Sequence, residues 1–254
     1  MFSLEIECGP EDRDFLIAEL WERRSAGIVG LDERRVRAFF EDGAGRESLL
    51  GMYPGAKFRV EEQRDWVASA RELLQPMEVG ARFYLVPVWR DDPTPPGRLR
   101  IAVNPGMAFG TGVHETTQLC MEALEDYLKP GMRALDVGSG SGILARAAHL
   151  LGADRVYACD IDNVAVEIAG RAGDLPHRFV GSVDAVASGL ADVVVANISP
   201  EAIMQLAPDL LRVRRAGGVL LASGLERNEI DAVKAAFPAP REVRTKRDWA
   251  LLVI

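Results

Sequence analysis

The first 64 residues alternate between two hydrophobic patterns. Residues 2–8 alternate apolar and polar side chains, which is typical of a strand with one buried face. Residues 12–24 space their apolar side chains as a helix does. The elements predicted after them are strands at 27–31 and 35–40, a helix at 46–52 and a strand at 57–62. This β-α-β-β-α-β order predicts a small ferredoxin-like α+β domain over residues 1–64.

RNA-binding domains share this order of elements, so two kinds of partner have to be weighed. An RNA reader would need an exposed, basic and aromatic third strand. The third strand here reads Arg-Val-Arg-Ala-Phe-Phe, lacks the glycines and interleaved aromatics of such a reader, and is followed by Glu41 and Asp42. The sequence therefore favours a substrate-recognition domain for protein over one for RNA.

Residues 65–97 are predicted to link this domain to the next. Residues 65–74 have helical character and residues 76–89 have strand character. Residues 91–97 read Asp-Asp-Pro-Thr-Pro-Pro-Gly, a stiff break in the pattern.

From residue 98 onward, strands alternate with helices. Continuous apolar runs, typical of parallel strands covered on both faces, occupy 133–137, 155–159, 192–196 and 218–222. Helical patterns follow them at 143–151, 163–169, 200–212 and 227–237. This alternation predicts a doubly wound, Rossmann-like α/β domain over residues 98–254. The last two strands, 242–246 and 249–254, are close enough for an antiparallel hairpin, which is more typical of methyltransferases than of dehydrogenases.

Composition limits the class of protein and its cellular location. Its 254 residues are 48% hydrophobic, enough for a catalytic domain plus a small one, and the net charge of −8 disfavours broad nucleic-acid binding. Three cysteines without paired spacing predict no disulfide framework and no metal site. No apolar run approaches the ~20 residues of a membrane span, and no signal peptide is evident. We therefore expect a cytoplasmic monomer without membrane or sequence-specific nucleic-acid contacts.

A glycine loop follows the strand at 133–137. Gly138, Gly140 and Gly142 allow a sharp turn and a close approach to a ligand, although a turn that binds nothing could look the same. Asp160 ends the next strand, where a carboxylate can accept hydrogen bonds from ribose hydroxyls. Alternatively, Asp160 caps the following helix, a role that Asp162 could fill equally well.

The loop spacing bears on the choice of cofactor. A dinucleotide fingerprint reads Gly-x-Gly-x-x-Gly, whereas Ile143 stands here at the place of the third glycine. Asp136, two residues before the first glycine, would repel a diphosphate but would tolerate the ammonium of a methionyl group. The pattern favours S-adenosylmethionine over NAD, and an NAD-dependent oxidoreductase stays as the alternative from another class.

At this point the chain resembles a known family. Residues 136–142, Asp-Val-Gly-Ser-Gly-Ser-Gly, together with Asp160 resemble the class I methyltransferase motif. Residues 104–117, Asn-Pro-Gly-Met-Ala-Phe-Gly-Thr-Gly-Val-His-Glu-Thr-Thr, resemble the signature of the methyltransferases that modify large-subunit ribosomal protein eleven. The resemblance extends over nearly the whole chain. It implies an S-adenosylmethionine-dependent protein-lysine N-methyltransferase acting on lysine and N-terminal amines of that protein, free or on the ribosome.

The resemblance also implies a set of cofactor-binding residues. Thr117, Gly138, Asp160 and Asn197 match family positions that contact S-adenosylmethionine, and Phe109, Gly110, Thr111 and His114 lie in the signature loop that lines the same pocket. With them we assign Asp136 and Gly140 from the glycine loop. The composition of the signature loop suits a flap that closes on the ligand. The alternative is a rigid connection in which Phe109 fills the core and His114 caps the helix that begins at Glu115.

Asn197 is the predicted catalytic residue. It ends the strand at 192–196, and open α/β sheets bind ligands at the carboxyl ends of their strands. Its carboxamide could accept a hydrogen bond from a substrate amine, although it could also cap the next helix. The sequence continues Ile-Ser-Pro rather than Pro-Pro-Tyr, which counts against the release-factor glutamine methyltransferases. A methyltransferase acting on another protein or a small amine remains the nearest rival.

Overall fold

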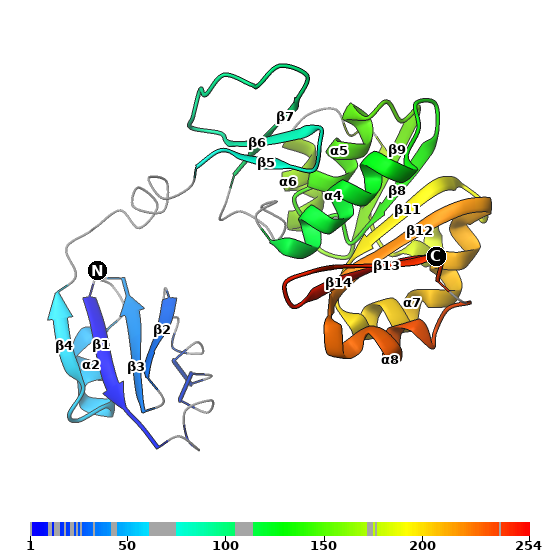
Figure 1. Ribbon diagram of the computed structural model, residues 1–254. Helices are drawn as coiled ribbons and strands as arrows, with labels where there is room; N and C mark the ends of the chain where they lie inside the picture. The colour runs from blue at the N-terminus through cyan, green and yellow to red at the C-terminus, as the bar shows by residue number, and fades with distance from the viewer. Residues whose placement is uncertain are drawn as a thin grey trace. The chain divides into compact units, whose positions relative to one another are not determined.

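The computed structural model describes residues 2–9, 12, 16–17, 19–20, 23, 25, 27–32, 34–41, 45–60, 75–104, 114–171, 175, 177–238 and 240–254. The chain forms two compact units, Met1–Leu73 and Leu74–Ile254 (Figure 1). The helix expected at 65–74 lies outside the described residues. In the described part of the chain, no helix is both long and apolar enough to cross a bilayer.

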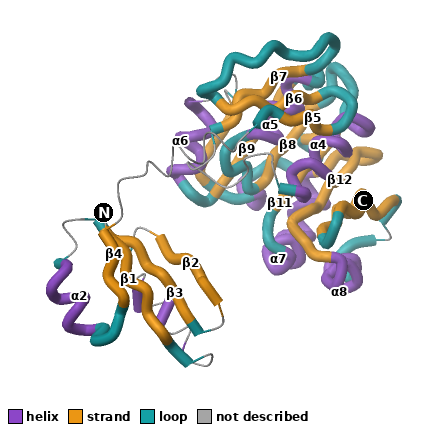
Figure 2. The backbone as a smooth tube through the Cα atoms, turned by 60° about the vertical axis from the view of Figure 1, so that its left-hand side comes forward, coloured by secondary structure: helices purple, strands orange, loops and turns teal. Residues whose placement is uncertain are grey.

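Unit 1 is built on a four-stranded antiparallel sheet in the order β2-β3-β1-β4. Its elements are β1 (Phe2–Glu7), β2 (Gly27–Asp32), β3 (Arg35–Phe40), α2 (Arg46–Met52) and β4 (Lys57–Val60). The strands at 27–31 and 35–40 and the helix at 46–52 agree with the sequence pattern. Figure 2 shows α2 beside this sheet, and its Leu49 belongs to the apolar cluster of Phe2, Leu4 and Phe40.

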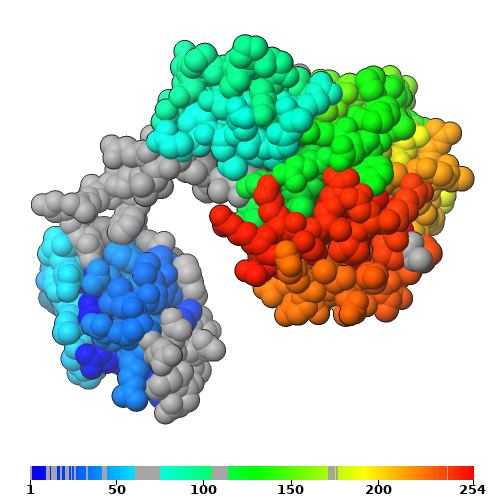
Figure 3. Space-filling view, in the orientation of Figure 1, coloured from blue at the N-terminus to red at the C-terminus, as the bar shows by residue number. Residues whose placement is uncertain are grey.

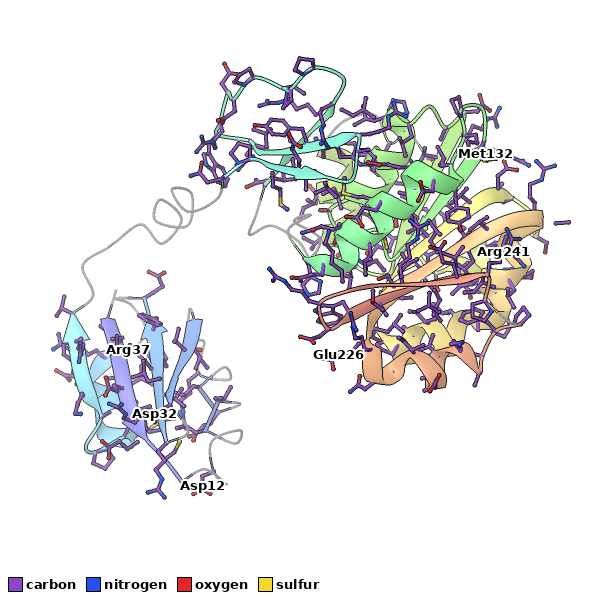
Figure 4. The ribbon with its side chains drawn as sticks, viewed as in Figure 1. Asp12, Asp32, Arg37, Met132, Glu226 and Arg241 are labelled. Carbon is purple, nitrogen blue, oxygen red and sulfur yellow. The ribbon has the colours of Figure 1, made fainter. Side chains whose placement is uncertain are left out.

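The other face of this sheet carries a buried acid surrounded by cations. Glu5, only 5% exposed, lies opposite Arg37 on one side and Lys57 on the other. Its carboxylate is within 3.0 Å of Arg37, 3.3 Å of Arg35, 3.7 Å of Lys57 and 3.8 Å of Arg59. Figure 4 labels Arg37 on this sheet. Because these four cations surround the Glu5 carboxylate, β1 tolerates an acid at its buried centre.

Unit 2 begins with a three-stranded sheet in the order β5-β6-β7. Its strands are β5 (Met77–Val79), β6 (Phe83–Pro87) and β7 (Leu99–Val103), with the proline-rich segment between β6 and β7. Phe83, Leu85 and Ile101 are buried in the same cluster as the first helix of the large domain. Because of this shared core, residues 75–97 belong to unit 2, although the sequence pattern placed them in a linker.

The large sheet has seven strands in the order β10-β9-β8-β11-β12-β14-β13. They are β8 (Arg133–Val137), β9 (Arg155–Asp160), β10 (His177–Val180), β11 (Ala191–Asn197), β12 (Arg214–Glu226), β13 (Glu242–Lys246) and β14 (Trp249–Val253). The first five are parallel, and β14 runs antiparallel to both β12 and β13. The predicted Rossmann-like fold with a terminal hairpin is confirmed.

Helices cover both faces of this sheet. They are α4 (Glu115–Tyr127), α5 (Ile143–Leu150), α6 (Asn163–Arg171), α7 (Pro200–Val213) and α8 (Ile230–Lys234), with 3₁₀ turns η2 (Val183–Ala185) and η3 (Arg227–Glu229). Val193 and Val195 of β11 pack in the cluster with α4 and α5, whereas Val194 and Ala196 pack in the cluster with α7 and α8. Burial on both faces accounts for the continuous apolar runs in the sequence.

Two elements differ in length from the pattern. β12 extends well beyond 218–222 at both ends, and its pairing with β14 shifts register between Ser223 and Leu225. A glycine with φ of +100° lies at that shift, so the apolar run marks only the part of β12 that is covered on both faces. The helix expected at 227–237 is a 3₁₀ turn followed by the short α8, which ends at Lys234 ahead of Pro238.

Candidate active site

A cavity of about 540 Å³ lies at the carboxyl edge of the large sheet. Its walls come from the ends of β8, β9 and β11, the first turn of α4 and the start of β14. The residues that line it include His114, Thr117, Gly138, Gly140, Asp160, Ser182, Asn197, Ile198, Gly224 and Trp249. The topology thus gathers at one edge residues that are far apart in the chain.

Six of the predicted site residues line this cavity: His114, Thr117, Gly138, Gly140, Asp160 and Asn197. Asp136 is not among the lining residues. The predicted residues Phe109, Gly110 and Thr111 lie outside the described part of the chain.

The glycine loop has a backbone that needs its glycines. Gly138, Gly140 and Gly142 have φ of 70°, 51° and 76°, in the left-handed region that other residues rarely adopt. A Cβ atom on Gly138 would also collide with Cγ2 of Ile198. The loop glycines therefore fix both the turn and its contact with the segment after β11.

Four amide groups of this loop donate hydrogen bonds within the protein. The amides of Gly138 and Ser139 donate to the Cys159 carbonyl at 2.9 and 3.0 Å, and Gly142 donates to Ser139 at 2.7 Å. The Gly140 amide donates to Oδ2 of Asp160 at 2.8 Å. A phosphate site at a helix N-terminus needs such amides to point at the ligand. These four amides are therefore not offered to a phosphate of a diphosphate ligand.

Asp160, the last residue of β9, faces the cavity. Besides the Gly140 bond, its Oδ1 accepts from the Asp162 amide at 3.0 Å. An ionised carboxylate has about four acceptor positions, so capacity remains for ligand hydroxyls. Asp162 itself accepts from the Val164 amide at 2.8 Å, in the first turn of α6. The helix cap is therefore Asp162, and Asp160 is left to the loop and the ligand.

Asp136 lies behind the loop rather than in the cavity wall. It is 1% exposed, and its Oδ2 accepts from the Ala145 amide of α5 at 2.9 Å. Its Oδ1 has no hydrogen-bond partner among the described residues. Burial and, to a smaller extent, the charge of Asp160 raise the pKa of Asp136 to about 7, although the hydrogen bond from the Ala145 amide lowers it. Asp136 thus fastens β8 to α5 across the glycine loop.

Asn197 ends β11 and contacts the first turn of α4. Its Nδ2 donates to Oγ1 of the buried Thr117 at 3.3 Å. The cap of α7 is Ser199, whose Oγ accepts from the Ala202 amide at 3.3 Å. The alternative that Asn197 caps this helix is therefore wrong. No described residue donates a hydrogen bond to its carboxamide oxygen, which is free to accept one from a ligand.

His114 caps a helix and also lines the cavity. It is the N-cap of α4, where its Nδ1 accepts from the Thr116 amide at 3.4 Å and lies 2.8 Å from the Thr116 hydroxyl. It also lines the cavity, where its ring meets Trp249 edge-on with centroids 4.6 Å apart. One side chain thus caps α4 and lines the cavity.

Sequence reasoning missed Trp249, Ser182 and Gly224 in the cavity wall. The predicted terminal hairpin held the signal for Trp249, because an antiparallel last strand begins at the edge where parallel strands end. After β10, Ser182 lines the cavity, whereas Asp184 is exposed and its carboxylate accepts from the Ala185 amide at 3.0 Å.

The charge of the wall distinguishes between ligand classes. Asp160 lines the cavity, but no lysine or arginine among the described residues does. A diphosphate would find a carboxylate and no cation, whereas a positively charged ligand would be accepted. The arrangement fits a cationic nucleoside better than a dinucleotide.

Comparisons with known proteins agree on one family. The family model described as ribosomal protein L11 methyltransferase (PrmA) matches residues 20–254. A ribosomal protein L11 methyltransferase of Symbiobacterium thermophilum is 42% identical over 254 residues, covering 96% of this chain and 82% of that protein. One of Caldanaerobacter subterraneus subsp. tengcongensis is 42% identical over 252 residues, covering 95% and 74%. Among solved structures, a ribosomal protein L11 methylase of Lactobacillus delbrueckii subsp. bulgaricus has a TM-score of 0.65 at 30% identity, covering 71% of this chain and 97% of that one.

Proposed function

The chain belongs to the ribosomal protein L11 methyltransferase family, and from this premise we propose that it methylates lysine side chains and the N-terminal amine of ribosomal protein L11. The observation that carries the proposal is the position of Asn197. Its carboxamide stands between Asp160 and the glycine loop on one side and Trp249 on the other. This is where an amine could meet a methyl donor held by the loop.

The cofactor of the family is S-adenosylmethionine, as the glycine loop predicted. When bound, it supplies a methyl group that a sulfonium has already activated. The site fits this group: the cavity is acidic, its wall lacks lysine and arginine among the described residues, and Asp160 keeps acceptor capacity. The same features disfavour NAD, because its diphosphate would meet a carboxylate and four loop amides that already donate within the protein.

Each residue near the cofactor receives a role in the proposal. Asp160 accepts hydrogen bonds from the ribose hydroxyls, and Gly138 and Gly140 allow the ligand to approach the backbone. Thr117 holds the Asn197 carboxamide from α4. Asp136 positions the loop from behind rather than contacting the ligand. His114 lines the pocket, and Phe109, Gly110 and Thr111 stay assigned to it on the motif alone.

Asn197 is proposed to orient the amine, because a carboxamide cannot take a proton at neutral pH. A lysine amine has a reference pKa of ~10.4, so making it neutral at pH 7 costs about 4.6 kcal/mol in water. The apolar wall beside Asn197, which includes Ile198 and Leu206, disfavours the charged form and lowers this cost. The proton leaves to water, and the Asn197 oxygen then accepts a hydrogen bond from the neutral amine.

Unit 1 is proposed to recognise the substrate protein through a ferredoxin-like domain over residues 1–64, with unit 2 as the catalytic domain. The sheet order β2-β3-β1-β4 supports this fold. Protein recognition is favoured over RNA recognition because Phe39 and Phe40 of β3 are 8% and 0% exposed and present no ring for base stacking. We propose a monomer that works in the cytoplasm, where ribosomal proteins are made, without membrane or sequence-specific RNA contacts.

The test is transfer of labelled methyl from S-adenosylmethionine to free L11, to large ribosomal subunits and to a mixture of other ribosomal proteins. We expect label in L11 alone, released at lysine and the N-terminal residue after digestion. Label in ribosomal RNA would contradict the proposed substrate class. Label in other proteins but not in L11 would favour the rival protein substrate instead.

A further inference from the structure

The cavity has two chemically different ends, because its walls follow the order of the strands. At the β9 and β10 end, Asp160 and Ser182 offer polar groups to a nucleoside. At the β12 and β14 end, Gly224 and Trp249 line the wall together with His114 of α4. Asn197 on β11 lies between them. If the polar end holds the nucleoside, the aromatic end is left for the substrate amine.

Trp249 reaches this edge because of its strand direction. β14 is antiparallel to β12, with Glu226 paired to Trp249 and Ser223 paired to Leu251. The first residue of β14 therefore lies where β11 and β12 end. Gly224 of β12 lets the Ile198 backbone approach this edge closely, since a Cβ atom there would collide with the Ile198 carbonyl oxygen. The aromatic end is thus built by the fold and not by a local motif.

Ion pairs hold the hairpin, and hence the ring, against α4. Arg247 lies 2.7 Å from Glu115, Lys246 lies 2.7 Å from Glu122, and Arg244 lies 2.8 Å from Asp126. Figure 3 shows the hairpin in red against the green surface that contains α4. The half-buried Trp249 ring meets His114 at an interplanar angle of 68°. The indole is therefore fixed relative to the helix turn that carries Thr117, the partner of Asn197.

We propose that Trp249, positioned edge-on to His114, forms the subsite for the substrate amine and sets how many methyl groups that amine receives. The inference rests on the proposed function of the site. An indole attracts alkylammonium cations, and the neighbouring wall holds no lysine or arginine among the described residues that would repel one. Partly methylated lysine, which is an alkylammonium ion, would be retained at this end for another round instead of leaving.

The experiment compares Trp249→Ala and Trp249→Phe with the wild-type protein. Val243→Ala is the matched control, because Val243 is exposed on the same hairpin and does not line the cavity. The measurements are the KM for L11, the distribution of mono-, di- and trimethylated products by mass spectrometry, and the Kd for S-adenosylmethionine. Melting temperatures check that each variant is folded.

For Trp249→Ala we expect KM for L11 to rise by about 3–30-fold, the size of one cation–π contact, and products to shift toward monomethylation. The Kd for S-adenosylmethionine should stay within about twofold, with Trp249→Phe intermediate and Val243→Ala unchanged. An unchanged product distribution and KM would overturn the subsite. So would a loss of turnover that is fully explained by weaker cofactor binding.

A second measurement separates this inference from the proposed substrate. Butyltrimethylammonium is titrated into the protein saturated with S-adenosylhomocysteine, and binding is followed by calorimetry. Wild type should bind this probe more tightly than Trp249→Ala, whether or not L11 proves to be the substrate. Equal binding by both would overturn the subsite, whereas failure of wild type to label L11 would overturn only the proposed substrate.

Discussion

The two ends of the active-site cavity are built in different ways. The end at β8 and β9 is made by backbone, with left-handed glycines at 138, 140 and 142 and one carboxylate at 160 that bonds to the loop. The end at β12 and β14 is made by side chains, His114 and Trp249, which lie far apart in the chain. A site made by backbone leaves a local motif in the sequence, whereas a site made by side chains depends on topology.

The largest effect is expected at Asn197, where the two ends meet. Asn197→Ala should lower kcat by about 10²–10³-fold, the usual cost of losing one positioned polar group at a reacting centre. The Kd for S-adenosylmethionine should change only a few-fold. Asn197→Asp keeps an acceptor oxygen and should retain more turnover than the alanine variant. Full turnover in Asn197→Ala would remove this residue from the mechanism.

The backbone end is tested by adding a single methyl group. Gly138→Ala should weaken S-adenosylmethionine binding by about 100-fold, because the left-handed backbone costs ~1–2 kcal/mol and overpacking costs a similar amount. Equilibrium binding of the cofactor is the measurement. The double variant Gly138→Ala/Ile198→Ala removes the collision but not the backbone cost, so it should recover part of the affinity.

Gly224→Ala is the comparison for the recovery expected when Ile198→Ala is combined with Gly138→Ala. Its Cβ atom would collide with the backbone of Ile198 rather than with its side chain. In the double variant Gly224→Ala/Ile198→Ala, the affinity for S-adenosylmethionine should therefore stay at the level of Gly224→Ala alone. Equal rescue at both glycines would contradict the described packing around Ile198.

The raised pKa of Asp136 predicts that the free energy of unfolding depends on pH. Its pKa is about 7 in the folded protein, against ~3.9 in an unfolded chain. Between about pH 4 and 7 the folded state holds a proton that the unfolded state has lost, so stability falls as pH rises through this window. Within this window the loss is at most about 1.4 kcal/mol per pH unit.

The measurement is urea unfolding of wild type and Asp136→Asn from pH 5 to 8. The asparagine can still accept from the Ala145 amide but does not titrate. We expect a flatter pH profile of the free energy of unfolding for the variant. Parallel profiles would show that Asp136 does not carry the effect.

The smallest effect is expected at the tip of the hairpin. Arg247 is 80% exposed where it pairs with Glu115, so Arg247→Ala should cost no more than about 1 kcal/mol of stability. Its φ of 51° is left-handed. Arg247→Gly therefore loses the same ion pair but relieves the backbone and should be the more stable of the two variants. Thermal unfolding distinguishes them, and the reverse order would contradict this reading.

The sequence predicted most of the large domain because burial on both faces of its strands produces apolar runs. It also located Asp160 and Asn197, since each ends such a run. It predicted strand character at 76–89 but not that β5 and β6 belong to unit 2, because their packing against α4 depends on contacts between distant segments, such as Glu125 with the amides of residues 81 and 82. Trp249 was missed for the same reason. Alternatives for single residues, such as the helix caps at Asp162 and Ser199, were decided only by local geometry.

The most direct test of the two-ended cavity is a pair of steady-state titrations on Asp160→Ala and Trp249→Ala, varying S-adenosylmethionine and L11 in turn. Asp160→Ala should raise the KM for S-adenosylmethionine by about 10–100-fold, since charge-assisted hydrogen bonds are lost, and leave the KM for L11 nearly unchanged. Trp249→Ala should raise the KM for L11 and leave the KM for S-adenosylmethionine nearly unchanged. If both variants raised the same constant, the division of the cavity into a cofactor end and an amine end would be wrong.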